Sequence, residues 1–129
     1  MPRIDIETLT RLAEASVAVK SSCTCSEVSL AAWRAVPLTL DPARLEELGF
    51  LFDDPYDEPS FAEYHPAGTR YESDSAPIAL RFYPYNRCAV LRCLDCNRHY
   101  LRYNEAGGYF TEIRMRALRP ELIVDTPPA

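Results

Sequence analysis

Two close pairs of cysteines, far apart in the chain, constrain this sequence more than any other feature. Cys23 and Cys25 form a C-x-C, and Cys93 and Cys96 form a C-x-x-C. Each short spacing lets two sulfurs reach one point, and a tetrahedral zinc site takes four such ligands. We therefore predict that Cys23, Cys25, Cys93 and Cys96 bind one zinc ion, which pins the N-terminal segment onto the C-terminal part.

The cysteine count favours a metal over disulfides. Five cysteines cannot all be paired with one another. Residues 1–11 carry acids and lack the apolar stretch of a signal peptide, and no run approaches the roughly 20 apolar residues of a membrane span. We therefore expect a cytoplasmic protein with no membrane association, in a compartment where stable disulfides are rare.

The length and composition are those of one globular domain. The chain has 129 residues, of which 47% are hydrophobic and 26% charged. We divide it into a mainly helical part (1–52), an acidic proline-rich loop (53–77), an antiparallel sheet (78–119) and a tail (120–129). The predicted fold class is α+β: N-terminal helices followed by a C-terminal antiparallel sheet that carries a zinc knuckle.

Two helices are predicted in the first part. Residues 5–19 have Asp5 as a candidate N-cap and apolar residues at helical spacing. A second, short helix is predicted to begin with Asp41 and Pro42 and to end at Gly49. Residues 28–36 fit either a short strand or a helical turn.

The loop at 53–77 mixes prolines, acids and aromatic residues without any period. A long aperiodic segment in a compact domain is usually functional. We predict that Asp53 to Asp74 contact a protein partner, with aromatic anchors and with acids that steer a basic partner. The alternative is that the tyrosines only cover the sheet. The anchors are Tyr56, Phe61, Tyr64 and Tyr71.

Four strands are predicted, at residues 78–83, 89–92, 99–103 and 109–115. Apolar residues alternate with arginines along them, which predicts one buried face and one basic face. Residues 1–80 carry a net charge of −8 and residues 81–119 one of +5. We expect the two halves to neutralise each other, so nucleic acid is not the expected partner. The arginines of the expected basic face are Arg92, Arg102, Arg114 and Arg116.

The stretch Cys93-Leu-Asp-Cys-Asn-Arg-His-Tyr100 resembles the zinc knuckle of zinc-ribbon and rubredoxin-like proteins. The resemblance covers residues 93–100 and implies a metal-binding hairpin, with Asn97 where a glycine is frequent. Asparagine tolerates the left-handed conformation that such a turn requires. The stretch from Pro84 to Arg116 is also similar to small uncharacterised bacterial proteins, a resemblance that implies no function.

Other candidate ligands are weaker. Cys88 and His99 lie near the C-x-x-C, but we interpret Cys88 as a core residue and His99 as an exposed strand residue. His65 is interpreted as a solvated loop histidine. The acids near it in the loop lack the spacing of a calcium loop and are interpreted as a solvated patch; they are Asp53, Asp54, Asp57 and Glu58.

The function that follows is that of a small zinc-stabilised protein that acts by binding a protein partner. We expect no enzyme activity, because no phosphate loop or Ser/His/Asp arrangement is present. A C-x-x-C thiol oxidoreductase is one alternative, although that chemistry needs the first cysteine at a helix N-terminus. A nucleic-acid-binding module that uses the arginine face is another. A bacterial immunity protein is a special case of partner binding that no particular residue selects.

Overall fold

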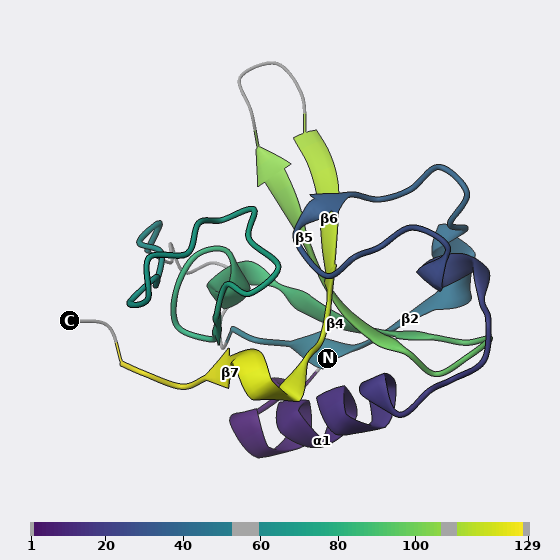
Figure 1. Cartoon of the computed structure of the whole chain (residues 1–129), viewed down its shortest axis with the longest axis horizontal. Helices are drawn as coiled ribbons and strands as arrows, with labels where there is room; N and C mark the ends of the chain where they lie inside the picture. Colours follow the sequence, from purple (N-terminus) through teal and green to yellow (C-terminus); the bar gives the residue numbers. More distant parts are fainter. Residues whose placement is uncertain (1, 53–59, 107–110, 128–129) are drawn as a thin grey trace.

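The protein is an α+β fold in which one N-terminal helix lies against a five-stranded antiparallel sheet (Figure 1). The computed structural model describes residues 2–52, 60–106 and 111–127. The helix is α1 (Ile6–Val17), and the strand order in the sheet is β1-β6-β5-β4-β2. These strands are β1 (Arg34–Ala35), β2 (Leu45–Phe50), β4 (Ala89–Cys93), β5 (His99–Ala106) and β6 (Thr111–Ala117).

Helix α1 confirms the prediction from its N-cap and apolar spacing. The Asp5 carboxylate accepts a hydrogen bond from the Thr8 backbone N–H at 2.9 Å, which satisfies one of the free donors of the first turn. Leu9 and Ala13 are fully buried against the sheet. Ser16, one turn further on, accepts from the His99 backbone N–H at 2.8 Å and ties the end of the helix to β5.

The predicted helix at 41–49 is wrong beyond its first turn. Asp41 does accept from the Ala43 backbone N–H, but only a 3-10 turn, η2 (Pro42–Arg44), follows it. The chain then extends as β2, which pairs antiparallel with β4. Residues 1–52 are therefore not mainly helical: in their described part they supply α1, two short 3-10 turns including η1 (Thr24–Ser26), and the strands β1 and β2.

The reason is that strand pairing outweighs local helix propensity here. As a strand, β2 places Glu46 beside Arg92 at 2.9 Å and Glu47 in an ion pair with Arg102. Gly49 is not a helix stop but a point of close approach. A Cβ at this position would lie 2.4 Å from the Pro2 carbonyl oxygen, so only glycine fits against the N-terminal segment.

Both faces of the sheet are buried, rather than one. Cross-strand partners in a sheet point to the same side, and the register places Leu101 opposite Arg116 and Tyr100 opposite Leu91. The face toward α1 carries the first core, built from Leu9, Val90, Leu101, Tyr103 and Leu118 among others. The other face carries the second core, which includes Cys25, Leu30, Leu91, Tyr100 and Met115.

The predicted basic face is therefore wrong. Arg102 pairs with Met115, which places it on the side of the second core, whereas Arg92 and Arg114 lie on the side of α1. Arg116 is fully buried and donates to the Tyr85 hydroxyl and to backbone carbonyls. Ile113, expected to be buried, is 47% exposed.

The run at 78–83 also departs from the prediction. Only β3 (Ile78–Ala79) is extended, and it pairs in parallel with β7 (Ile123–Val124) in a separate two-stranded sheet. The 3-10 turn η3 (Tyr85–Arg87) then leads into β4, and η4 (Pro120–Leu122) precedes β7, so the first part of the predicted tail is ordered. Within the described residues, no helix has the length and apolar character needed to cross a bilayer.

Candidate metal centre

The C-x-x-C lies in a tight turn between two central strands of the sheet. Cys93 is the last residue of β4, and Cys96 lies in the turn that leads to β5. The Asn97 backbone N–H donates to the Cys93 carbonyl at 2.9 Å, and Asn97 has a φ of 68°. This left-handed residue turns the chain back, as the resemblance to a zinc knuckle implies for the asparagine at this position.

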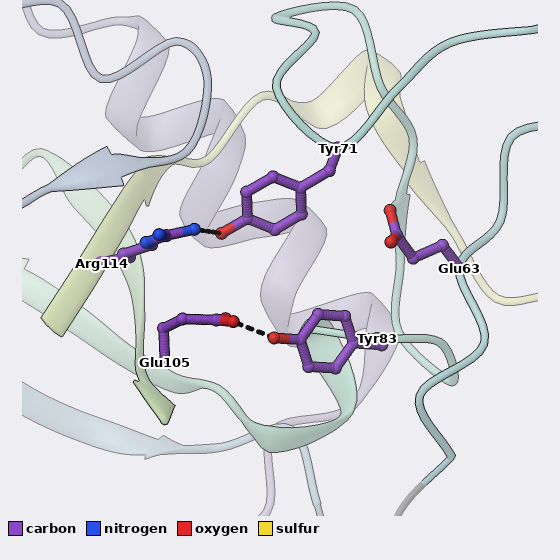
Figure 2. Close-up of a pocket in the computed structure, with 5 residues that line it drawn as sticks. All are labelled: Glu63, Tyr71, Tyr83, Glu105 and Arg114. Atoms are coloured by element: carbon purple, nitrogen blue, oxygen red, sulfur yellow. Dashed lines mark hydrogen bonds between the residues drawn. The ribbon is translucent and has the colours of Figure 1, made fainter. Parts of the chain in front are cut away.

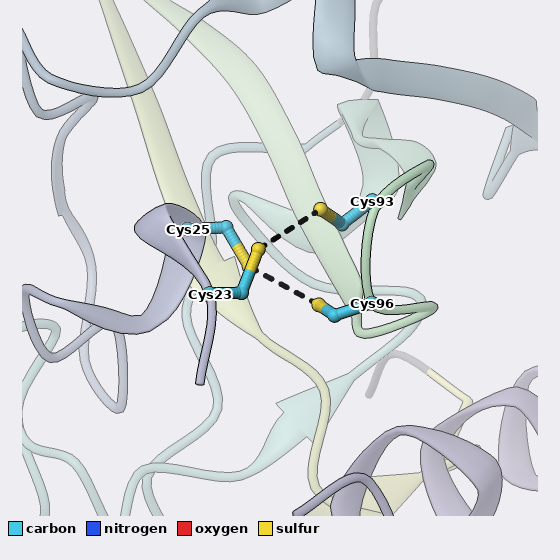
Figure 3. Close-up of side chains that lie close together, drawn as sticks. All are labelled: Cys23, Cys25, Cys93 and Cys96. Carbon is cyan, nitrogen blue, oxygen red and sulfur yellow. Dashed lines mark hydrogen bonds between the residues drawn. The ribbon is translucent and has the colours of Figure 1, made fainter. Parts of the chain in front are cut away.

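The C-x-C lies after α1, in the 3-10 turn η1 that packs against the second core. Cys25 is 2% exposed and Cys23 is half-buried. The Tyr100 hydroxyl of β5 donates to the Cys25 sulfur at 3.0 Å. The sheet thus holds a loop from the N-terminal third of the chain directly over the knuckle, and the two cysteine pairs face each other (Figure 3).

The four sulfurs have the spacing of ligands that share one metal ion. All of them lie within 4.8 Å of one another, with Cys23 Sγ 3.7 Å from Cys93 Sγ and Cys25 Sγ 3.5 Å from Cys96 Sγ. Sulfurs about 2.3 Å from a zinc ion at the centre of a tetrahedron are about 3.8 Å apart, whereas disulfide sulfurs are about 2.05 Å apart. The cluster is therefore compatible with a metal such as zinc, and its cysteines are not cross-linked.

The electrostatics differ across the cluster. The backbone N–H of Cys25 lowers the pKa of Cys23 to about 7. Burial raises the pKa of Cys25, and it also raises that of Cys93, where the backbone N–H groups of Asp95 and Cys96 act in the opposite direction. A metal stabilises thiolates that burial would otherwise keep protonated, and it therefore suits buried cysteines in this arrangement.

Two residues of the knuckle region surround the sulfurs. Tyr100 supplies a hydroxyl donor to Cys25, as described above. Although burial acts to lower it, the pKa of Arg98 is raised by the interaction of its guanidinium with the Cys96 and Cys25 sulfurs. Four thiolates around a divalent ion carry a net negative charge, so a guanidinium and a hydroxyl donor nearby stabilise such a site. Neither role was predicted from the sequence, because the spacing of Arg98 and Tyr100 from the cysteines does not mark either residue as a neighbour of the sulfurs.

Cys88 and His99 do not join the cluster. Cys88 is fully buried, as predicted, and its thiol donates to the Pro84 carbonyl at 3.2 Å. The prediction that His99 is exposed is wrong: it is 4% exposed and faces the side of α1 with its cross-strand partner Arg92. Cys93 and Tyr100 point to the opposite side of the sheet, which is why His99 lies outside the cysteine cluster.

The loop residues have other roles. His65 bonds to Thr69 Oγ1 at 2.7 Å and to Glu63 at 2.8 Å. Tyr64 packs on Phe82 and Tyr71 stacks on Trp33, so these two tyrosines cover the protein's own core, while Phe61 is 74% exposed. The acids Asp53, Asp54, Asp57 and Glu58, and Tyr56, lie outside the described residues.

A pocket forms where this loop meets β5 and β6 (Figure 2), and sequence analysis missed it because its residues come from distant, aperiodic segments. Its lining residues are Glu63, Tyr71, Tyr83, Glu105 and Arg114.

Comparison with known proteins identifies no family for this chain: no family model, no curated protein and no solved structure matches it. The assignment of function therefore depends on the geometry alone.

Proposed function

We propose that Cys23, Cys25, Cys93 and Cys96 bind one zinc ion in a structural site. The observation that carries the proposal is that four cysteine sulfurs from two distant segments lie within 4.8 Å of one another. Four protein thiolates complete a tetrahedral shell and leave no open position for substrate, which is the pattern of structural rather than catalytic zinc. Three of the four cysteines are buried, which further supports a closed site.

The role of the zinc in this proposal is to fix the segment 18–41 over the sheet. This segment has one 3-10 turn and one two-residue strand in it, and few regular backbone hydrogen bonds hold it. Metal binding that joins two distant segments contributes directly to the free energy of folding. Cobalt(II) substitution tests the ligand set: the proposal predicts the visible absorption of tetrahedral cobalt thiolate in the wild type and its loss in Cys96→Ser.

The protein then acts by binding a protein partner, through the loop around Phe61. Phe61 supports this location for the interface. Its ring is 74% exposed and packs against that of Tyr83, and exposed aromatic residues are typical anchors of interfaces. A cross-linking and pull-down comparison tests it. Phe61→Ala should weaken capture of a specific partner at least fivefold. Leu38→Ala, which removes a fully exposed apolar residue elsewhere, should not; equal effects would contradict the assignment.

The thiol oxidoreductase alternative receives less support from the geometry. Cys93 ends a strand rather than opening a helix, and burial raises its pKa, whereas a reactive thiol of this class has a lowered pKa. The nucleic-acid alternative also receives less support, because the arginines are divided between two faces and several pair with carboxylates.

A further inference from the structure

The pocket between the loop and the sheet has features of a ligand site that the zinc cluster does not explain. It has a volume of about 170 Å³, which is room for one large side chain rather than for a cofactor. Two tyrosine rings, Tyr71 and Tyr83, form walls, and two carboxylates, Glu63 and Glu105, line it together with Arg114 (Figure 2). The loop supplies Glu63 and Tyr71, so the pocket adjoins the partner surface proposed above.

Each carboxylate is held in place by hydrogen bonds to one of its two oxygens. Glu105 Oε2 accepts from the Tyr83 hydroxyl and, at 2.7 Å, from the Tyr103 hydroxyl. Glu63 Oε1 bonds to His65 at 2.8 Å. Among the residues that the structure describes, Glu105 Oε1 and Glu63 Oε2 have no hydrogen-bond partner. The hydrogen bonds from Tyr83 and Tyr103 also lower the pKa of Glu105, so this group is ionised at neutral pH.

The positive charge in the pocket is already engaged. Arg114 Nη1 donates to the Tyr71 hydroxyl at 3.1 Å, and its Nη2 lies 3.7 Å from Glu112. Two carboxylates and one arginine leave the lining with a formal charge of −1. Outside the lining, the negative charge of Glu112 beside Arg114 is balanced by the positive charge of Arg87 over the Tyr83 ring. The charge of the lining, together with the aromatic walls, favours a cationic ligand over an anionic one.

A guanidinium fits this lining better than an ammonium. It is planar, stacks on aromatic rings and donates several hydrogen bonds in a fixed geometry that suits two carboxylates at once. The protein itself already holds a guanidinium against the rim in this manner. Arg87 Cζ lies 4.7 Å from the centre of the Tyr83 ring and 4.3 Å from that of the exposed Phe61.

We propose that the pocket lined by Glu63, Tyr71, Tyr83 and Glu105 receives an arginine side chain of a protein partner. This inference rests on the proposed partner-binding function and adds the chemistry of the partner's anchor. Arginine is enriched among the residues that carry most of the binding energy in interfaces.

The test uses the full zinc-loaded chain and N-acetyl-arginine methylamide, a probe that presents the side chain without terminal charges. Titration followed by NMR should give saturable shifts at Glu63, Tyr71, Tyr83 and Glu105. The neutral isostere N-acetyl-citrulline methylamide should give none at the same concentration. Glu63→Gln should weaken binding about tenfold, as expected for one charge-assisted hydrogen bond. Glu72→Gln, the same change at an exposed position of the same loop that does not line the pocket, should leave binding unchanged.

Three outcomes would overturn the proposal: no saturable shift at the pocket, an equal response to the citrulline probe, or equal effects of Glu63→Gln and Glu72→Gln. Tighter binding of the free diamine putrescine than of the arginine probe would also overturn it, because the pocket would then select a small amine. Any of these results leaves zinc binding and the effect of Phe61→Ala on partner capture unaffected, so failure of this inference is distinguishable from failure of the proposed function.

Discussion

Replacement of Cys25 by serine separates a metal site from a cluster of buried thiols. A serine hydroxyl has nearly the shape of the thiol, but it is a poor zinc ligand. Structural zinc contributes about 10–16 kcal/mol of apparent binding free energy in small domains, which is about 2.5–4 kcal/mol for each of four ligands. Serine would also weaken the hydrogen bond that the Tyr100 hydroxyl donates to the Cys25 sulfur, which costs about 1 kcal/mol more. We therefore expect Cys25→Ser to lower the free energy of unfolding by about 3–5 kcal/mol.

The measurement is urea unfolding of zinc-loaded protein, with Cys88→Ser as the matched control. Cys88 is also fully buried, but its sulfur donates to a backbone carbonyl that a serine hydroxyl also reaches. We expect a cost of at most about 2 kcal/mol for this variant and an unchanged response to chelator. Equal losses of stability in the two variants would contradict a metal site at Cys25. So would a chelator effect on Cys25→Ser as large as that on the wild type.

Further predictions concern residues outside the cluster. Arg116→Lys should cost about 2–4 kcal/mol in urea unfolding, because lysine cannot supply the guanidinium's bonds to Tyr85, Ala31, Asp74 and Ala76; a cost below about 0.5 kcal/mol would contradict its role in the core. Burial lowers the pKa of His99 from 6.5, and the charge of Arg92 has a smaller effect in the same direction. The stability that the neutral His99 contributes is therefore complete above about pH 6.5 and is lost as the pH falls below it. Between pH 6.5 and 5, the free energy of unfolding of the zinc-loaded wild type should then fall by up to about 1.4 kcal/mol per pH unit more than that of His99→Asn. Parallel curves of the two free energies against pH would refute this. Gly49→Ala should cost about 1–3 kcal/mol in thermal unfolding, since its Cβ would meet the Pro2 carbonyl; an unchanged midpoint would show that the N-terminal segment moves aside.

The clustering of the four cysteines was predictable because metal chemistry requires few residue types at short spacings. Cys93 and Cys96 lie on one turn, and Cys23 and Cys25 lie on another, so each pair is brought together by local structure. Helix α1 was predictable for the same reason: Asp5 and the apolar spacing act within the helix itself.

The parts of the fold that were predicted wrongly depend on contacts between distant segments. The sequence Asp41-Pro42 correctly begins a turn, but whether Leu45 continues as helix or strand is decided by pairing with β4. Likewise, the alternation of apolar residues and arginines predicts which side chains share a face, but not that both faces are covered. Arg116 is buried because loop carbonyls from Asp74 and Ala76 meet its guanidinium, and no local pattern indicates their approach.

The zinc site is tested most directly by X-ray absorption spectroscopy at the zinc edge, combined with elemental analysis of protein purified without chelator. We expect about one zinc per chain and four sulfur ligands at about 2.3 Å from the metal. Folded protein without zinc, or a first shell that contains nitrogen or oxygen in place of one or more sulfurs, would contradict the assignment of Cys23, Cys25, Cys93 and Cys96 as the ligands.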